Sequence, residues 1–185
     1  MIDDILASAD QRMAKSLEAL QGVFGRIRTG RASPSLLDGI EVSYYGNPTP
    51  LNQVASVSVE DARTLAISPW EKKLIPEIEK AILKSDLGIT PSATSELVRV
   101  PLPSLTEENR RDLAKQARQE AEHARVSIRN IRRDAIGSIR SKVKDKELAE
   151  DDAHRGEDAI QKLTDKRIGE VDKALEAKEA DLMVI

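Results

Sequence analysis

The sequence contains no cysteine, and only 2% of its 185 residues are aromatic. The lack of cysteine excludes disulfides, thiolate metal sites and cysteine nucleophiles. The few aromatics disfavour an all-β sandwich, whereas the many Ala, Leu, Ile, Glu, Lys and Arg residues favour helices. The segment from Met1 to Asp4 lacks the basic start of a signal peptide, and no apolar run approaches the length of a membrane span. We therefore expect a mostly helical, soluble protein of the cytoplasm that does not bind membranes.

Motifs of catalysis are also missing. The sequence has no G-x-x-x-x-G-K-[ST] phosphate loop and no G-x-G-x-x-G fingerprint, so we expect no nucleotide hydrolysis by this chain. His123 and His154 have no acid and nucleophile pattern around them that would form a catalytic site. The acidic residues at 150–152 complement the dipole of a helix start better than they form a metal site. We expect no enzymatic activity, no metal and no cofactor.

All eight prolines lie in the middle of the chain, between Pro34 and Pro103. Three of the four aromatic residues lie in the same segment, and both flanks are free of proline. This change of composition indicates an inserted domain. We expect residues 30–105 to form that domain and residues 1–29 and 106–185 to form a second, discontinuous one.

Both flanks carry apolar residues three and four positions apart, which is the pattern of a helix with one buried face. The first stripe can end at Gly30, the second follows a helix cap at Thr106 and runs to about Lys146, and the polar segment 147–152 precedes the third. The first stripe consists of Leu6, Ala9, Met13, Leu17, Leu20, Val23, Phe24 and Ile27. The second consists of Ala117, Ala121, Ala124, Ile128, Ile131, Ala135, Ile139 and Val143, and the third of Ile160, Leu163, Ile168, Val171, Leu175 and Leu182. Three long stripes predict an antiparallel three-helix bundle.

The insert shows the alternation that is typical of short strands. Apolar and polar residues alternate around Val42, Val57, Ile67 and Val100, and the spacing over 75–83 fits a short helix that ends near Gly88. The predicted fold class is therefore α+β and mostly helical, with a small β/α/β domain inserted in the bundle. The two connections, at 30–34 and 101–105, form a double linker, which we expect to act as a hinge. Its candidate hinge residues are Gly30, Arg31, Pro101, Pro103 and Ser104.

Basic residues gather on one side of the long middle helix. At about 100° per residue, they fall within an arc of roughly 100° that Glu122 and Ile136 interrupt. They are Arg111, Lys115, Arg118, Arg125, Arg129, Arg132 and Arg140. A solvated helix face is the alternative interpretation, but arginine, with its planar fork, is the residue that suits phosphate recognition. We expect two patches that bind structured RNA, since few aromatics are available to stack on single-stranded bases. The first patch contains Arg28, Arg31, Arg110 and Arg111, and the second contains Arg125, Arg129, Arg132 and Arg133.

Five segments, in their order and spacing, resemble the ribosome recycling factor family over nearly the whole chain. They are Ile27–Ile40, Tyr44–Gly46, Arg99–Pro103, Leu105–Glu108 and Arg129–Ala135. The departures are Asn109, where the family often has a basic residue, Ala149, where a polar cap is common, and the Ile136–Gly137 pair.

The resemblance implies a protein of L-shaped, tRNA-like outline that lies across the tRNA sites of the post-termination ribosome. With elongation factor G and GTP it would promote subunit dissociation and release from mRNA, and initiation factor three would act downstream. Its helical domain would contact large-subunit ribosomal RNA, chiefly through Arg129 and Arg132, with Arg28 and Arg110 in support and Arg125 and Arg133 ranked lower. We expect a monomer. The competing hypothesis is a helical scaffold or adaptor that binds other proteins without RNA.

Overall fold

The computed structural model describes residues 1–184 and divides the chain into two compact units. The first, here called the helical unit, consists of Met1–Phe24 and Asp112–Ala180. The second, here called the mixed unit, consists of Gly25–Arg111 with the residues from Asp181 onward. None of the helices within residues 1–184 combines the length and apolarity that crossing a membrane requires.

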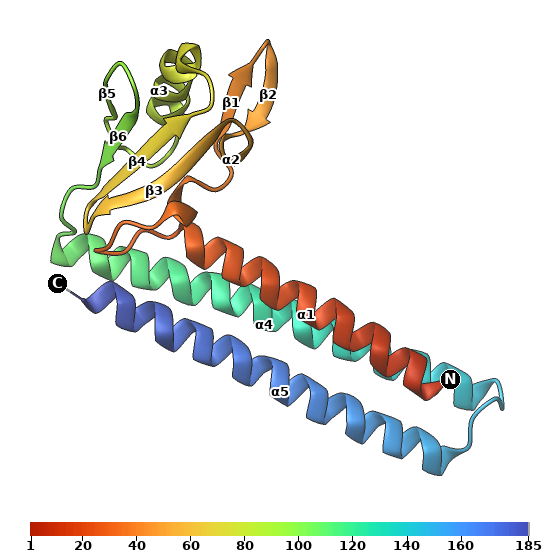
Figure 1. The fold of residues 1–185 in the computed structure, drawn as a ribbon. Coiled ribbons are helices and arrows are strands. Elements are labelled where there is room, and N and C mark those ends of the chain that lie inside the picture. The colour runs from red at the N-terminus through yellow and green to blue at the C-terminus, as the bar shows by residue number, and fades with distance from the viewer. Residues whose placement is uncertain (185) are drawn as a thin grey trace. The chain divides into compact units, whose positions relative to one another are not determined.

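Three long helices lie side by side in the helical unit (Figure 1). They are α1 (Ile2–Arg26), α4 (Glu107–Lys144) and α5 (Glu150–Met183). Cross-helix contacts show that α4 is antiparallel to both of the others: Arg12 pairs with Asp134 and Ser16 with Ser127, while Arg118 pairs with Glu179 and Arg140 with Glu157. The predicted three-helix bundle is confirmed.

The core of the helical unit is built from the predicted stripes. The buried residues of α4 are Ala117, Ala121, Ala124, Ile128, Ile131, Ala135 and Ile139. The small alanine side chains let the helices approach closely. Gly156 on α5 also allows a close approach, because a Cβ there would lie 3.1 Å from Ile139 Cδ1 and 3.2 Å from Ile2 Cγ2. Thr164 is also buried, which the apolar pattern did not predict, and its hydroxyl donates to the Ile160 carbonyl at 2.7 Å.

The helix ends follow local chemistry. Thr106 caps α4 as predicted, because its Oγ1 accepts a hydrogen bond from the Asn109 amide at 3.1 Å. Helix α1 ends at Arg26 and not at Gly30, since the Ser35 hydroxyl donates to the Gly25 carbonyl at 3.1 Å. Helix α4 ends at Lys144, two residues before the predicted end.

The mixed unit contains two antiparallel sheets. One is a hairpin of β1 (Glu41–Tyr44) and β2 (Asn47–Pro50), and the other has the order β3–β4–β6–β5. The strands of the second sheet are β3 (Ala55–Asp61), β4 (Thr64–Pro69), β5 (Ser92–Ala93) and β6 (Val98–Pro101). Helix α3 (Ile75–Lys84) packs beside β1, β5 and β6, and its Ile75, Ile78 and Ile82 are buried.

The predicted strands and the predicted helix of the mixed unit are confirmed, but several short elements were not predicted. These are β2, β5, the 3-10 helices η1 (Pro34–Leu37) and η2 (Lys72–Leu74), and α2 (Leu51–Val54). Each is four residues or fewer, too short to show a period, and β2 contains two prolines that an edge strand can accept.

Candidate nucleic-acid interface

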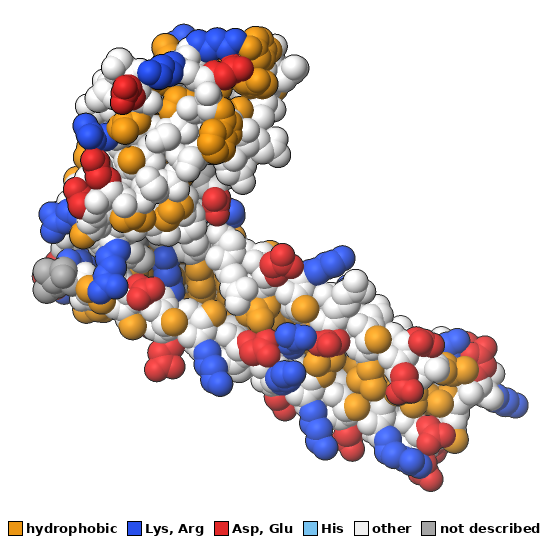
Figure 2. Space-filling view, in the orientation of Figure 1, with side chains coloured by type: hydrophobic (Ala, Val, Ile, Leu, Met, Phe, Trp, Pro, Cys, Tyr) orange, Lys and Arg blue, Asp and Glu red, His pale blue; other side chains and the backbone are white. Residues whose placement is uncertain are grey.

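Three arginines of the predicted basic arc lie along the contact between α4 and α5. Arg118 pairs with Glu179 at 2.6 Å, Arg125 with Asp172 at 2.6 Å and Arg140 with Glu157 at 2.9 Å. Arg111 pairs with Glu107 one turn away on its own helix. Much of the arc therefore neutralises acids of the bundle itself, and Figure 2 shows basic and acidic side chains interleaved along the visible face of the helices.

Arg125 is the most strongly engaged of these residues. Its side chain is only 18% exposed, and besides Asp172 it contacts Glu122 at 3.2 Å. Burial alone would lower the pKa of Arg125, but the hydrogen bonds to Asp172 and Glu122 outweigh it and raise the pKa. Arg125 thus ties α4 to α5, which leaves its guanidinium less available for a ligand.

Arg129, Arg132 and Arg133 are engaged more weakly. Arg129 pairs with Glu122 at 3.0 Å, and Arg133 donates to the side-chain oxygen of Asn130 at 3.4 Å. Arg132 is half-buried and donates to Gln161 Oε1 at 2.8 Å, while its buried Nε finds no hydrogen-bond partner among residues 1–184. Gln161 orients the Arg132 guanidinium without neutralising it, which suits an external phosphate.

Arg28 and Arg110 belong to the mixed unit and are half-buried. The Nε of each is buried and has no hydrogen-bond partner in the described part of the chain. Burial lowers the pKa of Arg28, and the nearby charge of Arg63 lowers it further. A guanidinium that has lost water without gaining an acid is a site that an anion would stabilise.

The candidate hinge residues also belong to the mixed unit. Pro101 is the last residue of β6 and pairs with Thr64, and Ser104 accepts a hydrogen bond from Arg63. Gly30 is closely packed, since a Cβ there would lie 3.1 Å from the Val184 carbonyl oxygen. Arg31 and Pro103 are exposed.

Arg63 is a residue that sequence reasoning missed. It lies in the turn between β3 and β4, and its only nearby charges in the sequence are Glu60 and Asp61, so no basic cluster marks it. Its significance depends on contacts with the linkers, which the sequence alone does not reveal.

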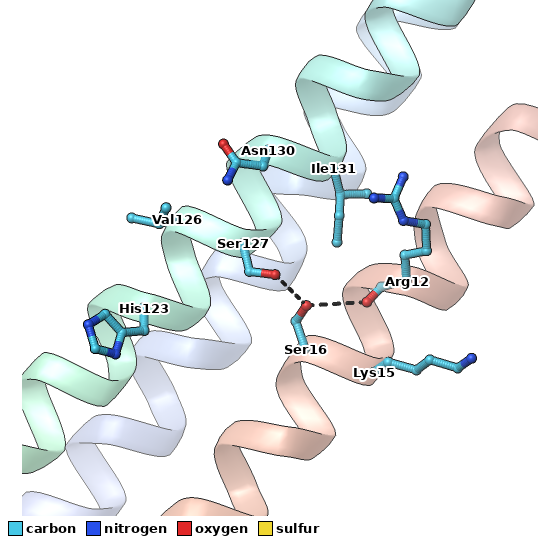
Figure 3. A pocket seen from close by; sticks show the side chains of 8 residues that line it. All are labelled: Arg12, Lys15, Ser16, His123, Val126, Ser127, Asn130 and Ile131. Carbon is cyan, nitrogen blue, oxygen red and sulfur yellow. Dashed lines mark hydrogen bonds between the residues drawn. The ribbon is translucent and has the colours of Figure 1, made fainter.

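A shallow groove of about 450 Å³ runs between α1 and α4 in the helical unit (Figure 3). Ser16 and Ser127 meet across it at 2.9 Å, while Lys15 points away from α4. The remaining lining residues are Arg12, His123, Val126, Asn130 and Ile131. Its polar groups bridge the two helices through the Ser16–Ser127 hydrogen bond and do not converge on one point.

The mixed unit exposes two large aromatic side chains, Tyr45 at 66% and Trp70 at 68%. Trp70 borders a groove of about 360 Å³ that Leu37, Leu51 and Val57 help to line. Such a surface can contact a protein. Within residues 1–184, no group of three or more His, Asp or Glu residues is placed to hold a metal ion.

Comparisons with known proteins agree with one another over most or all of the chain. The family model described as ribosome recycling factor matches residues 20–183. Ribosome-recycling factors of Saccharophagus degradans and Hahella chejuensis are 62% and 58% identical, each over 100% of both chains. A solution structure of the ribosome recycling factor is similar with a TM-score of 0.80 at 38% identity, covering 100% of this chain and 98% of the other.

A second solved structure comprises models for the T. thermophilus ribosome recycling factor and the E. coli elongation factor G bound to the E. coli post-termination complex. This chain is similar to it with a TM-score of 0.70 at 42% identity, and 100% of both chains is covered.

Proposed function

We propose that this chain, which belongs to the ribosome recycling factor family, binds the post-termination ribosome across its tRNA sites. With elongation factor G and GTP it promotes dissociation of the subunits and release from mRNA. One observation supports the proposal most directly. Arg28, Arg110 and Arg132 each have a buried Nε atom, and none of the three has a carboxylate partner among residues 1–184. Most of the other arginines in this part of the chain are paired with an acid.

Large-subunit ribosomal RNA is the proposed partner of these arginines. A phosphate backbone supplies the missing negative charge at each of them, and an arginine fork can hold it through two hydrogen bonds. We assign the first contacts to Arg129 and Arg132, supporting contacts to Arg28 and Arg110, and lesser roles to Arg125 and Arg133. The ion pairs of Arg125 with Asp172 and Glu122 support its low rank.

The energy for separation has to come from a partner. The sequence has no phosphate loop, and a bound protein shifts a conformational equilibrium only by its different affinities for the two states. This chain therefore biases the ribosome toward opening, while GTP hydrolysis by elongation factor G drives repeated cycles. Initiation factor three acts downstream by retaining the separated small subunit.

Light scattering from purified post-termination ribosomes tests this function. We predict a rapid fall of the signal only when this protein, elongation factor G and GTP are all present, with initiation factor three added to prevent reassociation. Equal splitting by the GTPase alone would show that this chain is not the recycling factor. Repeated splitting by this chain without the GTPase would contradict the energetic argument.

The alternative function is a helical scaffold for other proteins, and the exposed Trp70 surface favours it. A salt titration of ribosome binding separates the two, because phosphate contacts make log affinity fall linearly with log salt concentration. An apolar protein contact would show little such dependence.

We further propose that the protein acts as a monomer in the cytoplasm, where ribosomes are recycled. The functional domains are residues 1–29 with 106–185, and residues 30–105, with bending at 30–34 and 101–105. The division into two domains is supported by the two compact units of the chain, and by a core cluster whose buried residues all lie within 36–102.

A further inference from the structure

The turn between β3 and β4 holds both linkers of the mixed unit. The Ala32 amide of the first linker donates to the Ala62 carbonyl at 2.8 Å, and the Leu102 amide of the second donates to the Arg63 carbonyl at 2.7 Å. The Arg63 side chain also donates to the Ser104 hydroxyl. These bonds bring the chain just after Arg28 beside a turn that lies far away in the sequence.

The turn places Arg63 near Arg28 without an acid to neutralise either. No carboxylate within residues 1–184 forms an ion pair with Arg28 or Arg63. The nearest acid in the sequence, Asp61, instead accepts the Arg63 backbone amide at 2.9 Å, and Glu60 is taken by Arg99 at 3.0 Å. Two like charges that are near enough to repel each other thus lack a neutralising acid, and one of them, Arg28, is half-buried.

Such an arrangement is unfavourable in the free protein. Like charges repel, and burial removes the water that would screen them. Burial lowers the pKa of Arg28, and the repulsion from Arg63 lowers it further. An anion bound by both guanidiniums reverses the sign of this interaction and gives the Arg28 Nε the partner that it lacks.

We infer that Arg63 and Arg28 together form a binding site for one phosphate group of an RNA backbone. Arg63 is exposed and reaches the phosphate from the β3–β4 turn, while the half-buried Arg28 is the fixed member of the pair. The inference rests on the proposed function, because it takes ribosomal RNA as the source of the phosphate. It adds Arg63 to the proposed contacts and pairs it with Arg28 at one phosphate.

Binding of Arg63→Gln to purified large ribosomal subunits, measured over a range of salt concentrations, tests the site. We expect affinity to fall about tenfold and the slope of log affinity against log salt to decrease by about one. The matched control is Lys80→Gln, which removes the same charge from the same unit but at a residue paired with Glu77 on α3, and should change neither quantity.

A double-mutant cycle tests whether the two arginines share one phosphate. The Arg28→Gln/Arg63→Gln variant should bind only slightly more weakly than Arg28→Gln alone, whereas the losses from Arg63→Gln and Arg132→Ala should multiply. Multiplying losses for Arg28 and Arg63 would overturn a shared site. If Arg63→Gln does not fold, Arg63→Lys replaces it: charge and slope are kept, while loss of the fork lowers affinity.

Ser104→Ala separates phosphate binding from a positioning role. If Arg63 acted only by holding the second linker, Ser104→Ala would reproduce the loss of affinity while the salt slope stayed unchanged, and the inference would fail. The proposed function has its own test: if the wild-type protein does not bind the large subunit, that function is refuted. If the wild-type protein binds and the Arg63→Gln variant binds equally well, only the phosphate site is refuted.

Discussion

At the scale of single residues, Glu122 is the main local competitor for RNA on the α4 surface. Its carboxylate accepts hydrogen bonds from Arg129 at 3.0 Å and from Arg125 at 3.2 Å. These hydrogen bonds, that from Arg129 first, lower the pKa of Glu122. A carboxyl group with a lowered pKa stays ionised at neutral pH and loses its charge only as the pH falls below the ordinary carboxylate range. Arg129 therefore remains paired in the free protein near pH 7.

Glu122→Gln should accordingly strengthen ribosome binding, by about two- to fivefold, since an exposed ion pair of modest strength no longer competes with phosphate. Surface plasmon resonance with immobilised ribosomes measures the change. The control is Glu120→Gln, which removes the same charge from α4 beside His123 and not beside an arginine. Equal gains in both variants would indicate general charge attraction and would contradict a specific role of Glu122.

At the scale of elements, the end of α4 carries local strain. Lys146 has a φ of +58°, a left-handed conformation that disfavours side chains with a Cβ. The Glu147 amide donates to the Lys142 carbonyl at 2.9 Å and the Lys146 amide to the Val143 carbonyl at 3.0 Å, which is the hydrogen-bond pattern that usually places glycine at this position.

Lys146→Gly should stabilise the helical unit by about 1 kcal/mol, because glycine adopts this conformation without steric cost. Urea unfolding followed by far-ultraviolet circular dichroism measures the effect. Lys144→Gly, at the last residue of α4, removes the same charge but should destabilise by up to about 1 kcal/mol. A less stable Lys146→Gly variant would show that the Lys146 side chain contributes more than its backbone conformation costs.

At the scale of the whole molecule, the linkers limit where the proposed hinge can bend. Leu102 is buried at 5% exposure and hydrogen-bonded to the β3–β4 turn, and Pro101 belongs to β6. Pro103 and Ser104 are therefore the residues of the second linker whose removal spares the core of the mixed unit, although Ser104 loses its bond to Arg63.

Deletion of Pro103 and Ser104 should leave helicity and thermal unfolding nearly unchanged. It should slow recycling in the light-scattering assay by about tenfold or more, which is at least the effect of losing one phosphate contact. Replacement of the same two residues by Gly-Gly restores the length and should retain most of the activity. Normal recycling by the deletion variant would show that freedom at this linker is not required.

The sequence by itself determined the three long helices, the strands that alternate, the Thr106 cap and the family. These features are local or periodic, so each stripe such as that of α4 is visible in one stretch of chain. The family resemblance also depends on continuous segments. By contrast, β2, β5 and the early end of α1 escaped prediction, because a short strand needs a partner to exist and the Ser35 bond to Gly25 joins separate elements.

Only the tertiary structure decided which arginines remain available for a ligand. Seen along one helix, Arg118, Arg125 and Arg132 are equivalent members of a basic arc, but α5 offers a carboxylate to the first two and the amide of Gln161 to the third. In the same way, backbone bonds that join distant segments bring Arg63 near enough to Arg28 for their charges to repel. The physical reason is that electrostatic energy depends on distance in space and on burial, and neither quantity is contained in the order of residues.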